Sequence, residues 1–117
     1  MSKNDTEELL RTKDGSNGEY KWASLPNEDL EGANLEDANL QGADLSGVNL
    51  KNANLSRANL SKTMISNTDF SYANLAQADL SNSKIWMNQF VGANIAGIKL
   101  DGSRVIDCDL PNSINLA

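Results

Sequence analysis

Residues 33–60 read ANLEDANLQGADLSGVNLKNANLSRANL, and every fifth residue from Leu35 to Leu60 is leucine. The same spacing of bulky apolar residues extends outward on both sides, from Leu25 to Leu110, for eighteen consecutive positions. A period of five fits neither the 3.6 residues of a helical turn nor the two-residue alternation of a flat strand. Short fixed periods are typical of stacked repeats, so this period predicts the architecture of the chain.

Each five-residue unit has the order small, polar, large, followed by two turn-forming residues. One regular unit is Ala53-Asn54-Leu55-Ser56-Arg57. In an extended segment the small and large side chains point to one side and the polar side chain points to the other. The two trailing residues can adopt positive φ or hydrogen-bond their own backbone. Each unit is therefore predicted to be a very short strand followed by a corner, with its large and small residues inside.

The irregular units predict how many units form one coil. The segment 63–65 (Thr-Met-Ile) is echoed by 83–85 (Ser-Lys-Ile) and 103–105 (Ser-Arg-Val), and 68–70 (Thr-Asp-Phe) is echoed by 88–90 (Asn-Gln-Phe). Residues stacked in neighbouring coils should share an environment, so a spacing of twenty predicts four units per coil. The repeat region is then a four-sided solenoid.

These units resemble the pentapeptide repeat family, whose units read roughly A-(D/N)-L-x-x, over about three quarters of the chain. The chain is similar to short cyanobacterial members of unassigned role. The resemblance implies an all-β fold, a right-handed quadrilateral β-helix, here with about 4.5 coils of four pentapeptides. Glu28, Val48, Asn88 and Ile98 depart from the pattern at the small position. We expect Asn88 to point inward and to hydrogen-bond to backbone.

The chain is predicted to have three segments: an N-terminal cap (1–22), the β-helix (23–110) and a C-terminal tail (111–117). Asp5 with Glu8 three residues later is typical of a helix start. The cap is expected to be a short capping helix followed by a polar loop, and to cover the apolar end of the first coil.

The five-residue phase is lost after Leu110, and two outcomes are open for this end. In one, Ile114 and Leu116 fold over the last coil. In the other, the end stays open and two chains pair end to end, because unpaired strand edges favour association. The protein is then a monomer or an end-to-end homodimer through its C-terminal end.

Composition argues against catalysis and against a bound cofactor or metal. The 117 residues include one Cys and no His, and the net charge of the chain is −6. Histidine is the commonest general base and the commonest metal ligand, and no phosphate-binding loop or nucleophile motif replaces it. The N-terminus carries charge rather than the apolar run of a signal peptide, and no stretch is long enough to span a membrane. We therefore expect a cytoplasmic protein that is not an enzyme and has no membrane contact.

One ladder of outward amides could suggest calcium binding. It is formed by Asn34, Asn54, Asn74 and Asn94 on a single side of the solenoid. Neutral amides bring little charge to a Ca²⁺ site. We expect these side chains to form hydrogen bonds between coils instead.

One side of the predicted solenoid collects most of the excess acidic residues. This acidic face consists of Glu28, Asp29, Glu31, Asp69 and Asp109. The resemblance implies one role for it, because some family members protect gyrase by imitating duplex DNA. DNA carries one charge per roughly 1.7 Å, or about 13 over a rod of about 22 Å, so five acids match it poorly. Direct nucleic-acid binding is not expected at a pI near 4.4.

A neighbouring side carries apolar residues where the repeat usually has polar ones. This contact patch consists of Met64, Lys84, Trp86, Met87, Arg104 and Ile106. Exposed apolar clusters favour protein contacts. Alternatively, the C-terminal tail or an N-terminal segment folds over them. The sequence thus predicts a rigid module that binds an unknown protein partner, with a DNA-mimicking modulator of gyrase or topoisomerase as one alternative and a structural repeat without a single partner as the other.

Overall fold

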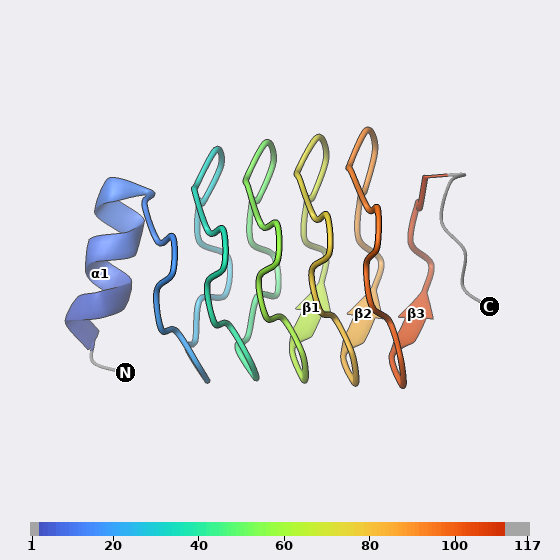
Figure 1. The fold of residues 1–117 in the computed structure, drawn as a ribbon, viewed down its shortest axis with the longest axis horizontal. Coiled ribbons are helices and arrows are strands. Elements are labelled where there is room, and N and C mark those ends of the chain that lie inside the picture. The colour runs from blue at the N-terminus through green and yellow to red at the C-terminus, as the bar shows by residue number, and fades with distance from the viewer. Residues whose placement is uncertain (1–2, 112–117) are drawn as a thin grey trace.

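The computed structural model describes residues 3–111 as a stack of coils with one helix across the N-terminal end (Figure 1). Helix α1 comprises Lys3–Thr12, and the three strands are β1 (Met64–Ser66), β2 (Lys84–Trp86) and β3 (Arg104–Ile106). The strands form one parallel sheet in the order β1-β2-β3. Elsewhere the coils pair through single residues, so few segments qualify as strands although the pairing is continuous.

Every coil pairs with the next at a separation of twenty residues. The strands follow this register, with Ile65 opposite Ile85 and Ile85 opposite Val105. The first coil pairs with the second through four parallel bridges: Asp14↔Asn34, Glu19↔Asn39, Ser24↔Asp44 and Asp29↔Asn49. Four pairing positions within twenty residues give each coil four sides. The spacing predicted from the irregular units is therefore confirmed.

The coils begin earlier than the sequence indicates. Asp14 and Glu19, predicted to lie in a polar loop, pair with the second coil, and Tyr20 is buried at an inward position. Residues 13–22 thus belong to the first coil, and the predicted boundary at residue 23 is corrected to residue 13. The pattern hides this unit because Gly15 occupies the large position. A Cβ at Gly15 would lie 2.8 Å from side-chain atoms of Leu9 and Leu35, which fill the missing volume.

Helix α1 packs against the N-terminal end of the apolar column (Figure 1), mainly through Leu9. Leu9 is fully buried in the same cluster as Tyr20 and Leu25, and Leu10 packs against that cluster. The rest of the helix is polar, and Arg11 pairs with Glu8 at 2.7 Å on its outer side. The helix is therefore held by burial of one apolar stripe rather than by its own propensity.

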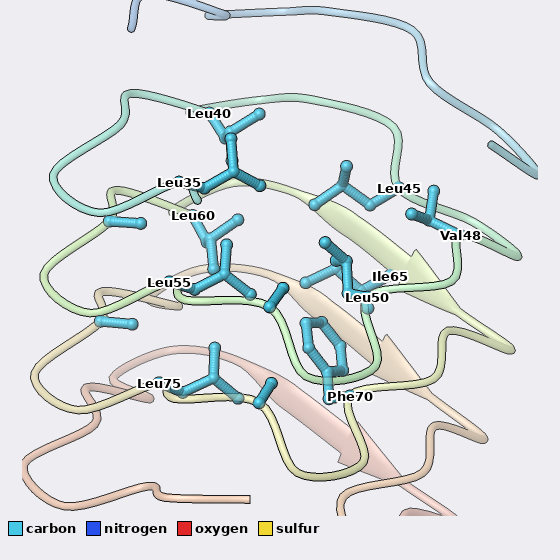
Figure 2. Close-up of a cluster of buried hydrophobic side chains, with 14 of the residues drawn as sticks. Leu35, Leu40, Leu45, Val48, Leu50, Leu55, Leu60, Ile65, Phe70 and Leu75 are labelled. Atoms are coloured by element: carbon cyan, nitrogen blue, oxygen red, sulfur yellow. The ribbon is translucent and has the colours of Figure 1, made fainter. Parts of the chain in front are cut away.

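The interior is a column of stacked large residues. Figure 2 shows Leu35, Leu55 and Leu75 one above another, each from a successive coil. All large positions from Leu25 to Phe90 are buried, and the rings of Phe70 and Phe90 stack 5.0 Å apart. In the last coil the large residues are only partly buried: Leu100, Val105 and Leu110. Each coil thus gains its apolar burial from its neighbours.

The second residue of each corner adopts the left-handed backbone conformation. From Asn17 to Asp107 every fifth residue has a positive φ, and this includes bulky residues such as Trp22 and Tyr72. The glycine one coil beyond each of these two rings makes room for it. A Cβ at Gly42 would lie 2.1 Å from the ring of Trp22, and one at Gly92 would lie 2.6 Å from the ring of Tyr72.

The outward asparagine ladder does not link the coils as expected. The Oδ1 atoms of its four members accept hydrogen bonds of 3.0–3.2 Å from the backbone N–H two residues later in the same unit: Asn34, Asn54, Asn74 and Asn94. Asparagine favours this local turn because its short side chain reaches its own backbone. The ladder therefore stabilises corners.

Asn88 replaces a backbone hydrogen bond inside the solenoid. In a regular corner, the backbone N–H of the residue after the turn donates to the carbonyl three residues earlier. The Ala73 N–H, for example, donates to the Phe70 carbonyl at 3.0 Å. At the corner below Asn88, Thr68 N–H donates to Asn88 Oδ1 at 2.8 Å, and Asn88 Nδ2 donates to the Ile65 carbonyl at 3.0 Å. The expected inward, backbone-bonded Asn88 is confirmed. Its amide opens the corner that follows β1.

We predict that Asn88→Asp lowers the free energy of unfolding by about 3 kcal/mol, because a carboxylate cannot donate to the Ile65 carbonyl and is buried without a cation. Urea unfolding followed by circular dichroism at neutral pH measures this. Asn94→Asp is the control, since exposed Asn94 Oδ1 only accepts from Ala96 N–H and a carboxylate does the same. It should change stability by less than about 0.5 kcal/mol. Equal effects of the two variants would contradict the role of Asn88.

We predict a loss of stability at alkaline pH that depends on Tyr20. Burial, followed by the charges of Asp5, Asp14 and Glu8, raises the pKa of Tyr20 above its usual value. The unfolded chain therefore ionises this phenol first, so stability that is present below about pH 10 declines as the pH rises through the folded-state pKa. Urea unfolding of wild type and Tyr20→Phe at about pH 8 and about pH 11 should show a smaller loss in the variant. Parallel losses would refute the prediction.

Candidate functional site

The contact patch lies on the outer side of the three-stranded sheet. Met64, Lys84 and Arg104 form one row across the strands, and Trp86 is in register with Ile106 in a second row. The middle residue of each strand points inward, so both rows face outward. The expected stacking of Trp86 beside Ile106 is therefore confirmed. Met87 follows at the corner, with a φ of 56°.

The apolar members of the contact patch are open to solvent. Met64 is 47% exposed, Met87 51% and Ile106 47%, and Trp86 is partly buried. Helix α1 lies at the opposite end of the stack, so that N-terminal segment does not cover them (Figure 1). Residues 112–117, the tail that the other alternative places over them, lie outside the described residues.

Unpaired cations border these apolar side chains. Lys84 and Arg104 are exposed and form no ion pair within residues 3–111. Lys62, which the sequence analysis did not include, joins Lys84 and Met64 around a hollow of about 280 Å³. Its position two residues before Met64, at the preceding corner, is the signal that could have placed it there.

The indole of Trp86 has an unsatisfied donor. Its Nε1 is buried and has no hydrogen-bond partner. A buried donor without an acceptor costs about 1–3 kcal/mol. A change that gives the Trp86 N–H an acceptor therefore lowers the free energy of the protein.

The acidic face is less continuous than the sequence suggests. Asp29, Asp69 and Asp109 lie in one row, but Asn49 and Gln89 occupy the coils between them. Successive acids of the row are thus two coils, or about 10 Å, apart.

The acids of the first coil are partly engaged in hydrogen bonds. Asn49 Nδ2 donates to Asp29 at 3.4 Å and to Glu31 at 3.1 Å. Glu28 is only partly exposed. The structure therefore brings Asp29 and Glu31 together and leaves Asp69 and Asp109 separate from them.

A second charged cluster was missed by the sequence analysis. Arg57 Nε donates to Asp37 Oδ1 at 3.1 Å, one coil away, and its guanidinium also pairs with Glu36. These hydrogen bonds, to Asp37 and then Glu36, raise the pKa of Arg57. The spacing of twenty between Asp37 and Arg57 could have revealed it. Half-exposed ion pairs of this kind contribute little to stability.

The described part of the chain has no cluster of three or more His, Cys, Asp or Glu side chains that could hold a metal ion. No helix in this part of the chain has the length and apolar character needed to cross a membrane.

Comparisons with known proteins identify the repeat. The family model for pentapeptide repeats matches residues 21–52 and 43–82 with eight copies, together more than half of the chain. A comparison with curated proteins finds no match.

Solved structures of repeat proteins share the fold. HetL, a pentapeptide repeat protein involved in heterocyst differentiation regulation in the cyanobacterium Nostoc sp. strain PCC 7120, is 24% identical with a TM-score of 0.70. The match covers 86% of this chain and 50% of HetL. A pentapeptide repeat protein from the thylakoid lumen of Arabidopsis thaliana is 27% identical with a TM-score of 0.66, covering 85% of this chain and 66% of the other. The chain thus spans half to two thirds of these proteins.

We predict that replacing the Trp86 N–H stabilises the protein. Trp86→benzothienylalanine keeps the two-ring shape and removes the donor, so the free energy of unfolding should rise by about 1 kcal/mol. The same replacement at Trp22, which is 63% exposed, should bring no gain because water can serve that N–H. Urea unfolding measures both variants. A loss of stability at position 86 would contradict the unsatisfied donor.

Proposed function

The chain belongs to the pentapeptide repeat family, and we propose that it acts as a rigid, non-catalytic module that binds a protein partner through the contact patch. The observation that carries this proposal is the exposure of Met64, Met87 and Ile106 on paired strands and the corner that follows them. Apolar side chains at neighbouring positions of a rigid surface lose little entropy when a partner covers them. Pentapeptide repeat proteins are generally structural, non-enzymatic modules, which supports the absence of catalysis in the proposal.

The acidic face gives weaker support to DNA mimicry. Duplex DNA carries one charge per roughly 1.7 Å, whereas the row of Asp29, Asp69 and Asp109 offers one per about 10 Å. Asn49 also engages two of the face's carboxylates. We therefore favour protein binding through the contact patch over modulation of gyrase through the acidic face, and over a structural repeat without a partner.

The remaining parts of the proposal concern the whole molecule. We take the solenoid to be right-handed, as the family implies, with α1 as its N-terminal cap. We place its action in the cytoplasm, which cell fractionation tests. The C-terminal end, where Leu100 and Val105 are only partly buried, leaves monomer and end-to-end homodimer for sedimentation to decide.

We predict that the double variant Met87→Ser/Ile106→Ser loses a partner that the wild-type protein retains. Both substitutions are on exposed side chains, so the fold should persist while two of the three exposed apolar side chains of the contact patch are removed. Immobilised proteins are exposed to extract of the source organism, and retained proteins are quantified by mass spectrometry.

The matched control is Tyr72→Ser/Val91→Ser, which removes apolar side chains of similar exposure, 61% and 48%, from another corner. It should retain the same partner as wild type. Loss with both double variants, or with the control alone, would refute the assignment to the contact patch. Circular dichroism and unfolding midpoints confirm that each variant is folded.

A further inference from the structure

The contact patch is cationic as well as apolar, in a protein of opposite overall charge. The net charge is −6, yet Lys62, Lys84 and Arg104 gather on this one side without an ion pair in the described part of the chain. Arg57 and Arg11, by contrast, have carboxylate partners on other surfaces. The three cations therefore form a local group whose charge is opposite to the net charge of the protein.

Two of the cations are forced into proximity by the strand register. Lys84 lies directly opposite Arg104 in adjacent parallel strands. Like charges directly across a pair of strands destabilise the pairing. A carboxylate placed between them would convert this repulsion into attraction. The register thus creates a position for an anion from outside.

A second carboxylate can enter a hollow that Lys84 lines on the side away from Arg104. Lys62, Lys84 and Asn82 are among the residues that line this space of about 280 Å³. Asp44 also lines it, and its Oδ1 already accepts a hydrogen bond of 3.0 Å from Ser46 N–H. Two lysines against one aspartate leave the hollow with an excess of positive charge.

We propose that the partner of the contact patch is an acidic protein segment in which apolar side chains stand between carboxylates. This inference rests on the proposed function and names the chemistry of the partner. The carboxylates bind at Lys62, Lys84 and Arg104, and the apolar side chains pack on Met64, Met87 and Ile106. Methionine suits this role because its flexible, polarisable side chain adapts to different apolar groups.

Trp86 is the residue that responds to binding. Its Nε1–H lacks an acceptor in the free protein. When the segment covers the row of Trp86 and Ile106, a carboxylate or carbonyl oxygen of the partner accepts that N–H as the indole turns outward. The fluorescence of Trp86 should therefore change on binding.

A protein segment fits this surface better than a nucleic acid. Nucleic acids also carry anions, but a protein of net charge −6 repels a long polyanion. The exposed apolar side chains also contribute little to a contact made mainly to phosphates. A short acidic peptide meets both the local positive charge and the apolar side chains.

The test uses full-length protein carrying Trp22→Phe, so that emission reports Trp86 alone. The probe is a short peptide that alternates glutamate with leucine or phenylalanine, titrated at low salt. We expect a saturable emission change, weakened at least about tenfold by Lys84→Gln/Arg104→Gln and by added salt. Lys99→Gln, an exposed lysine in another row, is the control and should bind as well as the parent.

Three probes decide the chemistry. A peptide with glutamine in place of glutamate, or with serine in place of the apolar residues, should bind at least about tenfold more weakly. Equal binding of either peptide, unchanged binding to Lys84→Gln/Arg104→Gln, or tighter binding of a single-stranded oligonucleotide would overturn the inference.

The two proposals fail separately. If the acidic peptide does not bind but Met87→Ser/Ile106→Ser still loses its partner from extract, only the chemistry assigned here is wrong. If that double variant retains every partner, the contact patch itself is not the binding surface. Unchanged circular dichroism of all variants excludes unfolding as the cause.

Discussion

The structure depends on parallel pairing of each coil with the next at a separation of twenty residues. This register places every large residue over another large residue and every corner over another corner. Neither the single-residue bridges nor the three-residue strands could persist alone, because each buries its apolar side only against its neighbours. The same register lines up the outward residues in rows. Packing inside and chemistry outside are therefore consequences of one constraint.

Asn88, a polar residue in the core, lies behind the strands that present the apolar contact patch. Asn88 inserts its amide between Ile65 and Thr68 and opens the corner after β1. At this corner the three-residue strands replace single bridges, and the next residues in the row are Trp86 and Ile106. The corner that this buried amide holds open directly follows a strand of the sheet that presents the contact patch. The polar residue in the core and the apolar residues on the surface therefore occur at the same place in the solenoid.

Charge is distributed by row rather than by region. The acidic row alternates with neutral amides, and Arg57 spans Asp37 and Glu36 across neighbouring coils. On the side that holds the contact patch, Lys62, Lys84 and Arg104 gather without carboxylate partners among the residues that the structure describes. In a solenoid of net negative charge, such a side is the natural place for an acidic partner.

The period of five and its echo at twenty determined, from the sequence alone, the four-sided solenoid, the inward column and the row that pairs Trp86 with Ile106. These are consequences of periodicity, which the chain carries locally. The tertiary structure decided what depends on neighbours in space: that Gly15 completes a first coil because Leu9 fills its volume, that the Asn34 ladder bonds to its own turns, and that Lys62 joins Lys84 around a hollow. Volume, hydrogen-bond competition and side-chain reach across coils are set only when the coils stack.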